Sequence, residues 1–366
     1  MRRGVNFNKF WEEYFQSESR NLLYVLGRGF DPRMCAGLEA ILKSGGSGVR
    51  NCLLIEFDEG PNSSSTRHAP LVSKNISKLN GMLQDRGNLL PKQVKMWSDE
   101  GPGRHRIGSR SAAEVFSDKS DFEPYTDIVI DISAMPRSIY LPLIGKTLFL
   151  IDRAKENNSI KPIPNLHIVV AEDAKLDRRI RDDGIDDNAS YIHGFGSDLE
   201  MEATAGIPKI WMPILGEEQA AQLERIYNLI NPDEVCPVLP FPSINPRRGD
   251  ELLVEYRELL FDQWRVEPRN IIYASEQNPF ETYRQIHQAV CLYNKVLSPL
   301  SGCKTVVSAM SSKLLSIGGL LAAYELGVRM SVGIANIEAQ GYNMDDNVTS
   351  EEELFTLWLA GDCYDP

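Results

Sequence analysis

The chain has 366 residues, of which 42% are hydrophobic and 25% are charged, and its formal net charge is −12. At about 100 to 200 residues per domain, this length predicts two domains, each large enough to bury a core of its own. The acidic balance argues against binding to duplex nucleic acid, which needs many Lys and Arg side chains against the phosphates. It leaves a small anionic ligand, held by a few local groups, as the expected binding partner.

No apolar run reaches the roughly 18 residues of a membrane-spanning helix, and the first residues lack the apolar core and cleavage site of a signal peptide. We therefore expect a cytoplasmic protein with no membrane contact. The six cysteines are scattered and form no CxxC pair, which is typical of reduced, structural thiols. The five histidines show no metal-ligand spacing with one another or with cysteine, so no metal and no cofactor are expected.

In chain order, residues 1–20 are expected to hold a short amphipathic helix with an aromatic face, which packs on the domain that follows. Residues 21–196 are predicted to form that first domain, because buried β-branched runs alternate there with helical apolar periodicity. Residues 191–195 are expected to add an edge strand at its end. The five main strands are expected at residues 22–26, 52–57, 93–97, 127–133 and 166–171.

Residues 197–207 are polar and rich in small side chains, which is typical of a linker. The pattern then repeats over residues 208–366, the second predicted domain. Residues 354–359 are expected to match the edge strand at the end of the first domain. The five main strands are expected at residues 209–215, 234–239, 270–275, 304–308 and 331–336.

The same three residues close the fourth strand of each series. Ser133-Ala134-Met135 ends one strand and Ser308-Ala309-Met310 ends the other, each just before a helix. Strands that alternate with helices form parallel sheets with right-handed crossovers. We therefore predict an α/β fold of two tandem, internally repeated Rossmann-like units, each a mostly parallel, doubly wound sheet of five to six strands.

Such a sheet commonly has the strand order 3-2-1-4-5, and ligands bind at the carboxyl ends of strands 1 and 4, where the order reverses. In the first unit, glycines, arginines and two helix N-termini favour an anion there. In the second, hydroxyls and one lysine lie opposite Glu217 and Glu218, which favours a more neutral group. The candidate ligand-binding residues are Gly27, Arg28, Gly29, Phe30, Ser133, Met135 and Arg137 in the first unit, and Ser308, Ser311, Ser312 and Lys313 in the second.

A Rossmann-like unit with a ligand-reading loop after strand 1 and a small-residue turn after strand 4 resembles the CARF and SAVED modules of prokaryotic defence systems. The resemblance rests on residues 27–30, 133–137 and 308–313 and on the tandem layout. It implies a cyclic nucleotide or oligonucleotide ligand and a role in antiviral defence. Such modules are commonly fused to an effector, for which the two predicted domains leave no segment. The resemblance therefore implies a nucleotide-binding sensor or adaptor that acts through a separate effector protein.

An enzyme is the first alternative. It would be a hydrolase or transferase that acts on a phosphorylated or nucleotide substrate in the cleft between the two units. Its candidate acid, base and anion clamp are Asp131, Glu172, Glu276 and Arg137. A scaffold that docks a partner through the aromatic face of the N-terminal helix or through Trp358 is a further alternative.

A protein that binds an NAD-type dinucleotide is the remaining alternative. Gly27 and Gly29 follow the first strand, and Glu56 or Asp58 lies near the end of the second, as in the dinucleotide fingerprint. Pro32, however, stands in place of the third glycine, and the acidic residue lies farther on than the usual gap of about 20 residues. No P-loop motif and no GxSxG hydrolase elbow occurs.

Overall fold

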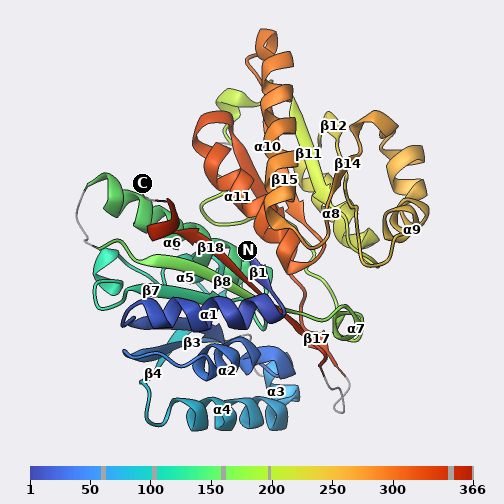
Figure 1. Ribbon diagram of the computed structural model, residues 1–366. Helices are drawn as coiled ribbons and strands as arrows, with labels where there is room; N and C mark the ends of the chain where they lie inside the picture. Colours follow the sequence, from blue (N-terminus) through green and yellow to red (C-terminus); the bar gives the residue numbers. More distant parts are fainter. Residues whose placement is uncertain (59–62, 101–104, 158–161, 197–198, 345–349, 365–366) are drawn as a thin grey trace. The chain divides into compact units, whose positions relative to one another are not determined.

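The computed structural model describes all residues except 59–62, 101–104, 158–161, 197–198, 345–349 and 365–366. The chain forms two compact units (Figure 1). The first contains residues 1–184 and 340–366, and the second contains residues 185–339. The chain thus leaves the first unit once and returns to it.

The first unit is built on a seven-stranded sheet with the order β1-β18-β8-β7-β2-β3-β4. Strands β4, β3, β2, β7 and β8 are parallel, while β18 and β1 are antiparallel to their neighbours. Read along the chain, the parallel strands have the predicted order 3-2-1-4-5. The bounds are β1 Arg2–Arg3, β2 Leu22–Gly27, β3 Arg50–Asp58, β4 Leu89–Lys95, β7 Asp127–Asp131, β8 Asn165–Glu172 and β18 Glu353–Ala360. Two short pairs complete the strands, β5 Trp97–Ser98 with β6 His105–Arg106 and β9 Arg181–Asp182 with β17 Tyr342–Asn343.

Helices of the first unit cover this sheet, and α1, α2 and α4 share one core cluster with β2. The N-terminal helix packs on the first domain as predicted, because Phe7 and Trp11 are fully buried. This burial excludes these two rings from an exposed docking face. The bounds are α1 Val5–Ser17, η1 Pro32–Cys35, α2 Ala36–Lys43, α3 Ser64–Arg67, α4 Ala69–Leu83, α5 Gly108–Ala113, η2 Lys119–Asp121, α6 Arg137–Glu156, α7 Ala174–Asp177 and η7 Asp362–Tyr364.

The second unit is built on a sheet with the order β10-β16-β15-β11-β13-β14, with β12 paired to β11. Its five main strands are parallel and again follow the order 3-2-1-4-5, while β10 is antiparallel to β16. The strands are β10 Ser190–Tyr191, β11 Lys209–Ile214, β12 Glu234–Val235, β13 Val238–Pro240, β14 Ile272–Ala274, β15 Lys304–Ala309 and β16 Val332–Asn336. The helices are η3 Glu202–Thr204, α8 Ala220–Ile230, α9 Arg248–Glu255, η4 Glu258–Gln263, η5 Pro268–Asn270, α10 Pro279–Val296, η6 Ser298–Leu300 and α11 Lys313–Met330.

The predicted domain boundaries are wrong, because each expected edge strand belongs to the other sheet. Strand β10 pairs with β16 in the second sheet, and β18 runs beside β8 in the first (Figure 1). Phe355 and Leu357 of β18 are buried, and Trp358 packs on Phe10 and Tyr14 of α1, so this segment completes the first core. The expected linker lies within the second unit, where Leu199 is part of the core.

The protein is therefore a mixed α/β fold with two largely parallel sheets. None of the helices in the described part of the chain combines the length and the apolarity that a bilayer crossing requires.

Candidate functional site

The turns that follow β2 and β7 meet at the carboxyl edge of the first sheet. A Cβ atom on Gly27 would lie 2.9 Å from Cγ of Met135 and 3.4 Å from the carbonyl oxygen of Ala134, and one on Gly29 would lie 3.6 Å from that oxygen. The two turns therefore pack against each other where the strand order reverses. Gly27 makes room for this contact within the protein, whereas the sequence had suggested that the glycines favour a bound anion.

The helix that follows the β2 turn has its N-terminus occupied by a carboxylate of the chain itself. Asp31 accepts a hydrogen bond from the Arg33 backbone N–H at 2.8 Å, and its carboxylate pairs with the Arg33 guanidinium at 2.8 Å. Arg33 also pairs with Asp177 at 2.8 Å and is buried. Of the two helix N-termini expected to attract an anion, this one is therefore already neutralised.

Two further candidates, Ser133 and Met135, lie in the interior. Ser133 is fully buried, and its hydroxyl accepts a hydrogen bond from the Ala171 N–H of β8 at 2.8 Å. Its own N–H donates to Asp131 at 2.9 Å. Met135 is also buried, against the Gly27 turn. These residues hold the β7 turn in place, and their burial corrects the expectation that they contact a ligand directly.

Arg28, Phe30 and Arg137 remain at the surface of this site. The side chain of Arg28 is 46% exposed, and its Nη1 atom lies 3.4 Å from Oε1 of Glu56, at the end of β3. Phe30 and Arg137 are half-buried. Arg137 is the first residue of α6, whose N-cap residue, Pro136, makes no side-chain hydrogen bond to the first turn. This edge thus presents two cations and one aromatic ring.

Of the acid and base residues proposed for an enzyme, Asp131 and Glu172 end β7 and β8 of the first sheet, and Glu276 lies in the second unit. Asp131 is 1% exposed and accepts a hydrogen bond from the Tyr24 hydroxyl at 2.5 Å. Burial, together with this carboxylate, raises the pKa of Tyr24 well above its usual value, so the phenol stays a donor. Glu172 is the last residue of β8 and is half-buried. Asp131 therefore has a structural partner and little contact with solvent.

In the second unit, the turns after β11 and β15 also meet. A Cβ atom on Gly216 would lie only 2.0 Å from the carbonyl oxygen of Met310. The Ser308 hydroxyl is fully buried and accepts a hydrogen bond from the Trp211 indole at 3.0 Å, and Ser312 caps α11 through the Leu315 N–H at 3.3 Å. Both serines therefore have structural roles.

The other two candidates of the second unit, Ser311 and Lys313, lie beside these serines. Ser311 is buried between Met310 and the Ser312 cap, and Lys313 is half-buried at the first position of α11.

A charged cluster that the sequence did not predict lies at the same edge of the second sheet. Arg248, at the start of α9, is 3.4 Å from Glu217 and also pairs with Glu276. Glu276 accepts a further hydrogen bond from the Ile244 N–H at 2.8 Å. The sequence indicated Glu276 as a candidate acid or base and Glu217 as a residue beside the candidate site of the second unit. Nothing in the local sequence around Arg248 indicates that this arginine pairs with them.

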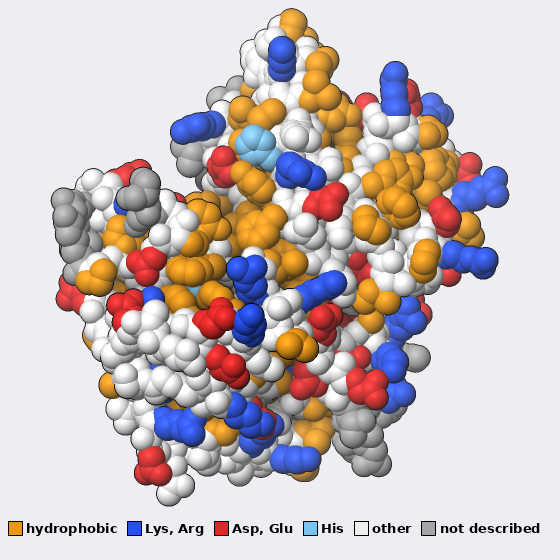
Figure 2. All heavy atoms as spheres, viewed as in Figure 1, with side chains coloured by type: hydrophobic (Ala, Val, Ile, Leu, Met, Phe, Trp, Pro, Cys, Tyr) orange, Lys and Arg blue, Asp and Glu red, His pale blue; other side chains and the backbone are white. Residues whose placement is uncertain are grey.

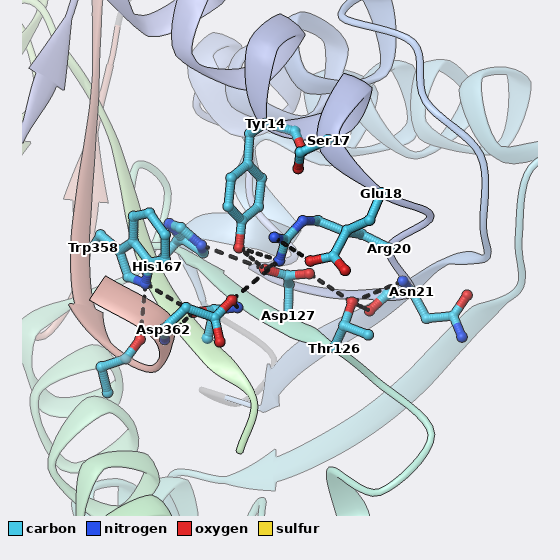
Figure 3. A network of polar contacts seen from close by, with 12 residues as sticks. Tyr14, Ser17, Glu18, Arg20, Asn21, Thr126, Asp127, His167, Trp358 and Asp362 are labelled. Carbon is cyan, nitrogen blue, oxygen red and sulfur yellow. Dashed lines mark hydrogen bonds and ion pairs between the residues drawn. The ribbon is translucent and has the colours of Figure 1, made fainter. Parts of the chain in front are cut away.

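At the opposite, amino edge of the first sheet lies a buried polar network centred on Asp127 (Figure 3). This carboxylate accepts hydrogen bonds from the Tyr14 hydroxyl at 2.5 Å and the Thr126 hydroxyl at 2.6 Å. Arg20 lies 3.4 Å and His167 lies 3.5 Å from its Oδ1 atom. The network joins α1 to β7 and β8; the sequence predicted the two strands as parallel neighbours but not the position of α1 at this edge.

The titratable groups of this network are shifted by burial and by one another. Burial lowers the pKa of His167, although Asp127 acts in the opposite direction. Burial alone would raise the pKa of Asp127, but the nearby His167 and hydrogen bonds from Thr126 and Tyr14 hold it below its usual value. With Asp127 and His167 both fully buried, we assign the network a structural role.

No protein-family model matches the chain, and no curated protein sequence matches it. Among solved structures, the chain is similar to the cytoplasmic domain of a prokaryotic cation chloride cotransporter, with 10% identity and a TM-score of 0.21. The match covers 88% of this chain and 97% of that one. A similarity of this size carries no argument about fold or function, so the function has to be argued from the site itself.

Proposed function

We propose that the chain is a nucleotide-binding sensor or adaptor that acts through a separate effector protein. The observation that carries the proposal is the contact between the β2 and β7 turns, at the point where the order of the first sheet reverses. In open α/β sheets, ligands bind outside the carboxyl ends of the strands at this point. We place the ligand beside Arg28, Phe30 and Arg137.

The chemistry of the three surface residues supports a phosphate-bearing ligand. Guanidinium groups pair with phosphate through two parallel hydrogen bonds, and the first turn of a long helix such as α6 adds partial positive charge. Glu56, close to Arg28, opposes a bare anion but can accept hydrogen bonds from sugar hydroxyls. A ribose next to the phosphate would satisfy both groups.

The distribution of charge supports a local site in place of a broad basic surface. Over the described residues on the face in Figure 2, Lys and Arg side chains are interspersed with Asp and Glu. Duplex binding depends on many phosphate contacts, whereas a single nucleotide needs only a few.

The resemblance to CARF and SAVED modules extends this proposal to a cyclic nucleotide or oligonucleotide and to antiviral defence. We further propose that the two units are Rossmann-like repeats of one ancestral sheet. The shared strand order and the Ser-Ala-Met turn after the fourth strand of each unit support this interpretation. An NAD-type dinucleotide is a second candidate ligand, favoured by the position of Glu56 at the end of β3.

Thermal shift with a panel of ligands tests the proposal. The panel comprises cyclic mono- and dinucleotides, cyclic oligoadenylates, NAD, ADP and inorganic pyrophosphate. A ligand that binds only the folded state raises the melting temperature, so at least one nucleotide should do so. Arg28→Ala and Arg137→Ala should each reduce that shift, whereas Arg110→Ala, at a largely exposed arginine of α5, should leave it unchanged.

Two results would contradict the proposal. In the first, no nucleotide of the panel stabilises the wild-type protein. In the second, Arg28→Ala lowers the melting temperature of the ligand-free protein by several degrees. An exposed arginine that lies 3.4 Å from Glu56 should contribute little to folding, so such a fall would mark it as structural.

A further inference from the structure

Phe30 lies in a backbone segment that is held from both sides. One side-chain amide, that of Asn75 in α4, donates to the carbonyl oxygen of Gly29 at 3.0 Å and to that of Asp31 at 2.9 Å. These two carbonyls flank Phe30 in the chain. Asn75 is buried, so its two hydrogen bonds are shielded from water and fix the direction in which Phe30 leaves the backbone.

The ring of Phe30 is supported from within the protein. Its centroid lies 4.6 Å from that of His68, with 34° between the two planes, which is within the range of aromatic pairs. His68 is buried, while Phe30 is half-buried and keeps part of its surface in solvent. The result is a flat apolar surface whose position is set before any ligand arrives.

This ring is two residues from Arg28, within the turn that meets the β7 turn. A preordered, partly exposed aromatic ring in the same turn as an exposed arginine suits a ligand that has both a flat ring and an anionic group. Bases stack on aromatic side chains with little dependence on base identity, because every base has a π-face. Holding the ring in place in advance also reduces the entropy that binding costs.

We infer that Phe30 is the base-stacking residue of the site, with His68 supporting the ring and Asn75 positioning it. The inference rests on the proposed nucleotide site and names what it recognises: a nucleoside phosphate, with the base on Phe30 and the phosphate towards Arg28. Stacking contacts the face of a base and not the polar edge that distinguishes one base from another. The site therefore discriminates weakly between adenine and guanine.

Isothermal titration with ADP, inorganic pyrophosphate and adenosine separates the two parts of the ligand. ADP should bind more tightly than pyrophosphate to the wild-type protein. Phe30→Ala should weaken ADP binding about ten- to one-hundred-fold, in line with the loss of one stacked base, and leave pyrophosphate binding unchanged. Phe30→Leu, which keeps apolar bulk without a ring, should behave like Phe30→Ala.

Two variants complete the design. Phe30→Trp should retain ADP binding, and its fluorescence should be quenched by ADP but not by pyrophosphate. Phe149→Ala removes a phenylalanine of α6 that is 47% exposed, and it should bind ADP like the wild type. If Phe30→Leu binds ADP as well as the wild type, or if pyrophosphate binding falls as much as ADP binding, the ring does not stack on the base.

The outcomes also separate this inference from the proposed function. If the wild-type protein binds pyrophosphate and ADP equally tightly, the anion site of the proposed function is supported and base stacking on Phe30 is ruled out. A wild-type protein that binds none of the three probes overturns the inference about Phe30, whereas the proposed function is overturned only if no nucleotide of the wider panel stabilises the protein.

Discussion

Asp127→Asn should destabilise the first unit far more than its small change in shape suggests. Asp127 is 0% exposed, and its carboxylate contacts Tyr14, Thr126, Arg20 and His167. Asparagine fills the same space and still accepts a hydrogen bond from Tyr14. What it lacks is the negative charge opposite the buried guanidinium.

The structure sets the size of the effect. Removing one partner of a buried ion pair costs about 3–5 kcal/mol, because the other charge stays buried without compensation. Arg20 keeps two further carboxylates, Glu18 at 2.5 Å and Asp362 at 3.7 Å, both more than half exposed. We therefore expect Asp127→Asn to cost about 3 kcal/mol, the lower end of that range. Glu18→Gln is the matched control and should cost at most about 1 kcal/mol, since the side chain of Glu18 is itself 60% exposed.

Hydrogen exchange measured by mass spectrometry can assign the loss to one unit. A single unfolding free energy is poorly defined for a chain with two units, so the exchange of β7 and β8 amides is the better quantity. In Asp127→Asn these amides should exchange roughly one hundred-fold faster, while amides of β11 and β15 in the second unit stay as in the wild type. An acceleration no larger than that of Glu18→Gln would refute a structural role for the buried charge.

Two further predictions concern pH and glycine. Burial lowers the pKa of His167, so the folded unit binds fewer protons there than the unfolded chain, whose histidine titrates near pH 6.5. The stability of the first unit should be complete above about pH 6.5 and fall below it. His167→Phe should flatten that fall between about pH 7 and pH 5, measured as the exchange of β7 and β8 amides corrected for their intrinsic rates. Gly216→Ala should destabilise the second unit by about 1–3 kcal/mol, because its Cβ would lie 2.0 Å from a carbonyl oxygen, whereas Gly29→Ala, at 3.6 Å, should be neutral in the same measurement. Equal effects of the two alanines would contradict the packing argument.

The order of the main strands could be predicted because each one is encoded locally. Each buried run ends in a turn or cap, such as Asp31 with Pro32, and each is followed by a helix, so the parallel topology follows from the alternation. The partners of the edge strands could not be predicted in this way. The alternation of Phe355 and Leu357 indicates a strand but not its neighbour. That choice depends on the place of Trp358 beside α1, more than 340 residues earlier in the chain.

The candidate site was predictable in its place but not in its detail. The meeting of the turns after strands 1 and 4 follows from topology alone. The role of each hydroxyl does not, because a serine serves a backbone N–H or an indole as readily as a ligand. Ser133 bonds to Ala171 and Ser308 to Trp211, both far away in sequence. The Asp31 cap is encoded locally, but its ion pair with the buried Arg33, which neutralises one of the two expected anion sites, is not.

Strand β7 runs from the amino edge of the first sheet to its carboxyl edge and has a buried carboxylate at each end. Its first residue, Asp127, and its last, Asp131, are both buried, and each accepts a hydrogen bond from a tyrosine, Tyr14 or Tyr24, at 2.5 Å. These carboxylates stabilise the fold, so substitution of either one should lower the stability of the first unit. Arg28 is exposed at the carboxyl edge and stabilises the fold little, so its substitution should weaken binding instead. Because Arg28 follows β2 while both buried carboxylates lie on β7, a loss of binding without a loss of stability in Arg28→Ala would distinguish the proposed nucleotide site from a network of polar groups that only supports the fold.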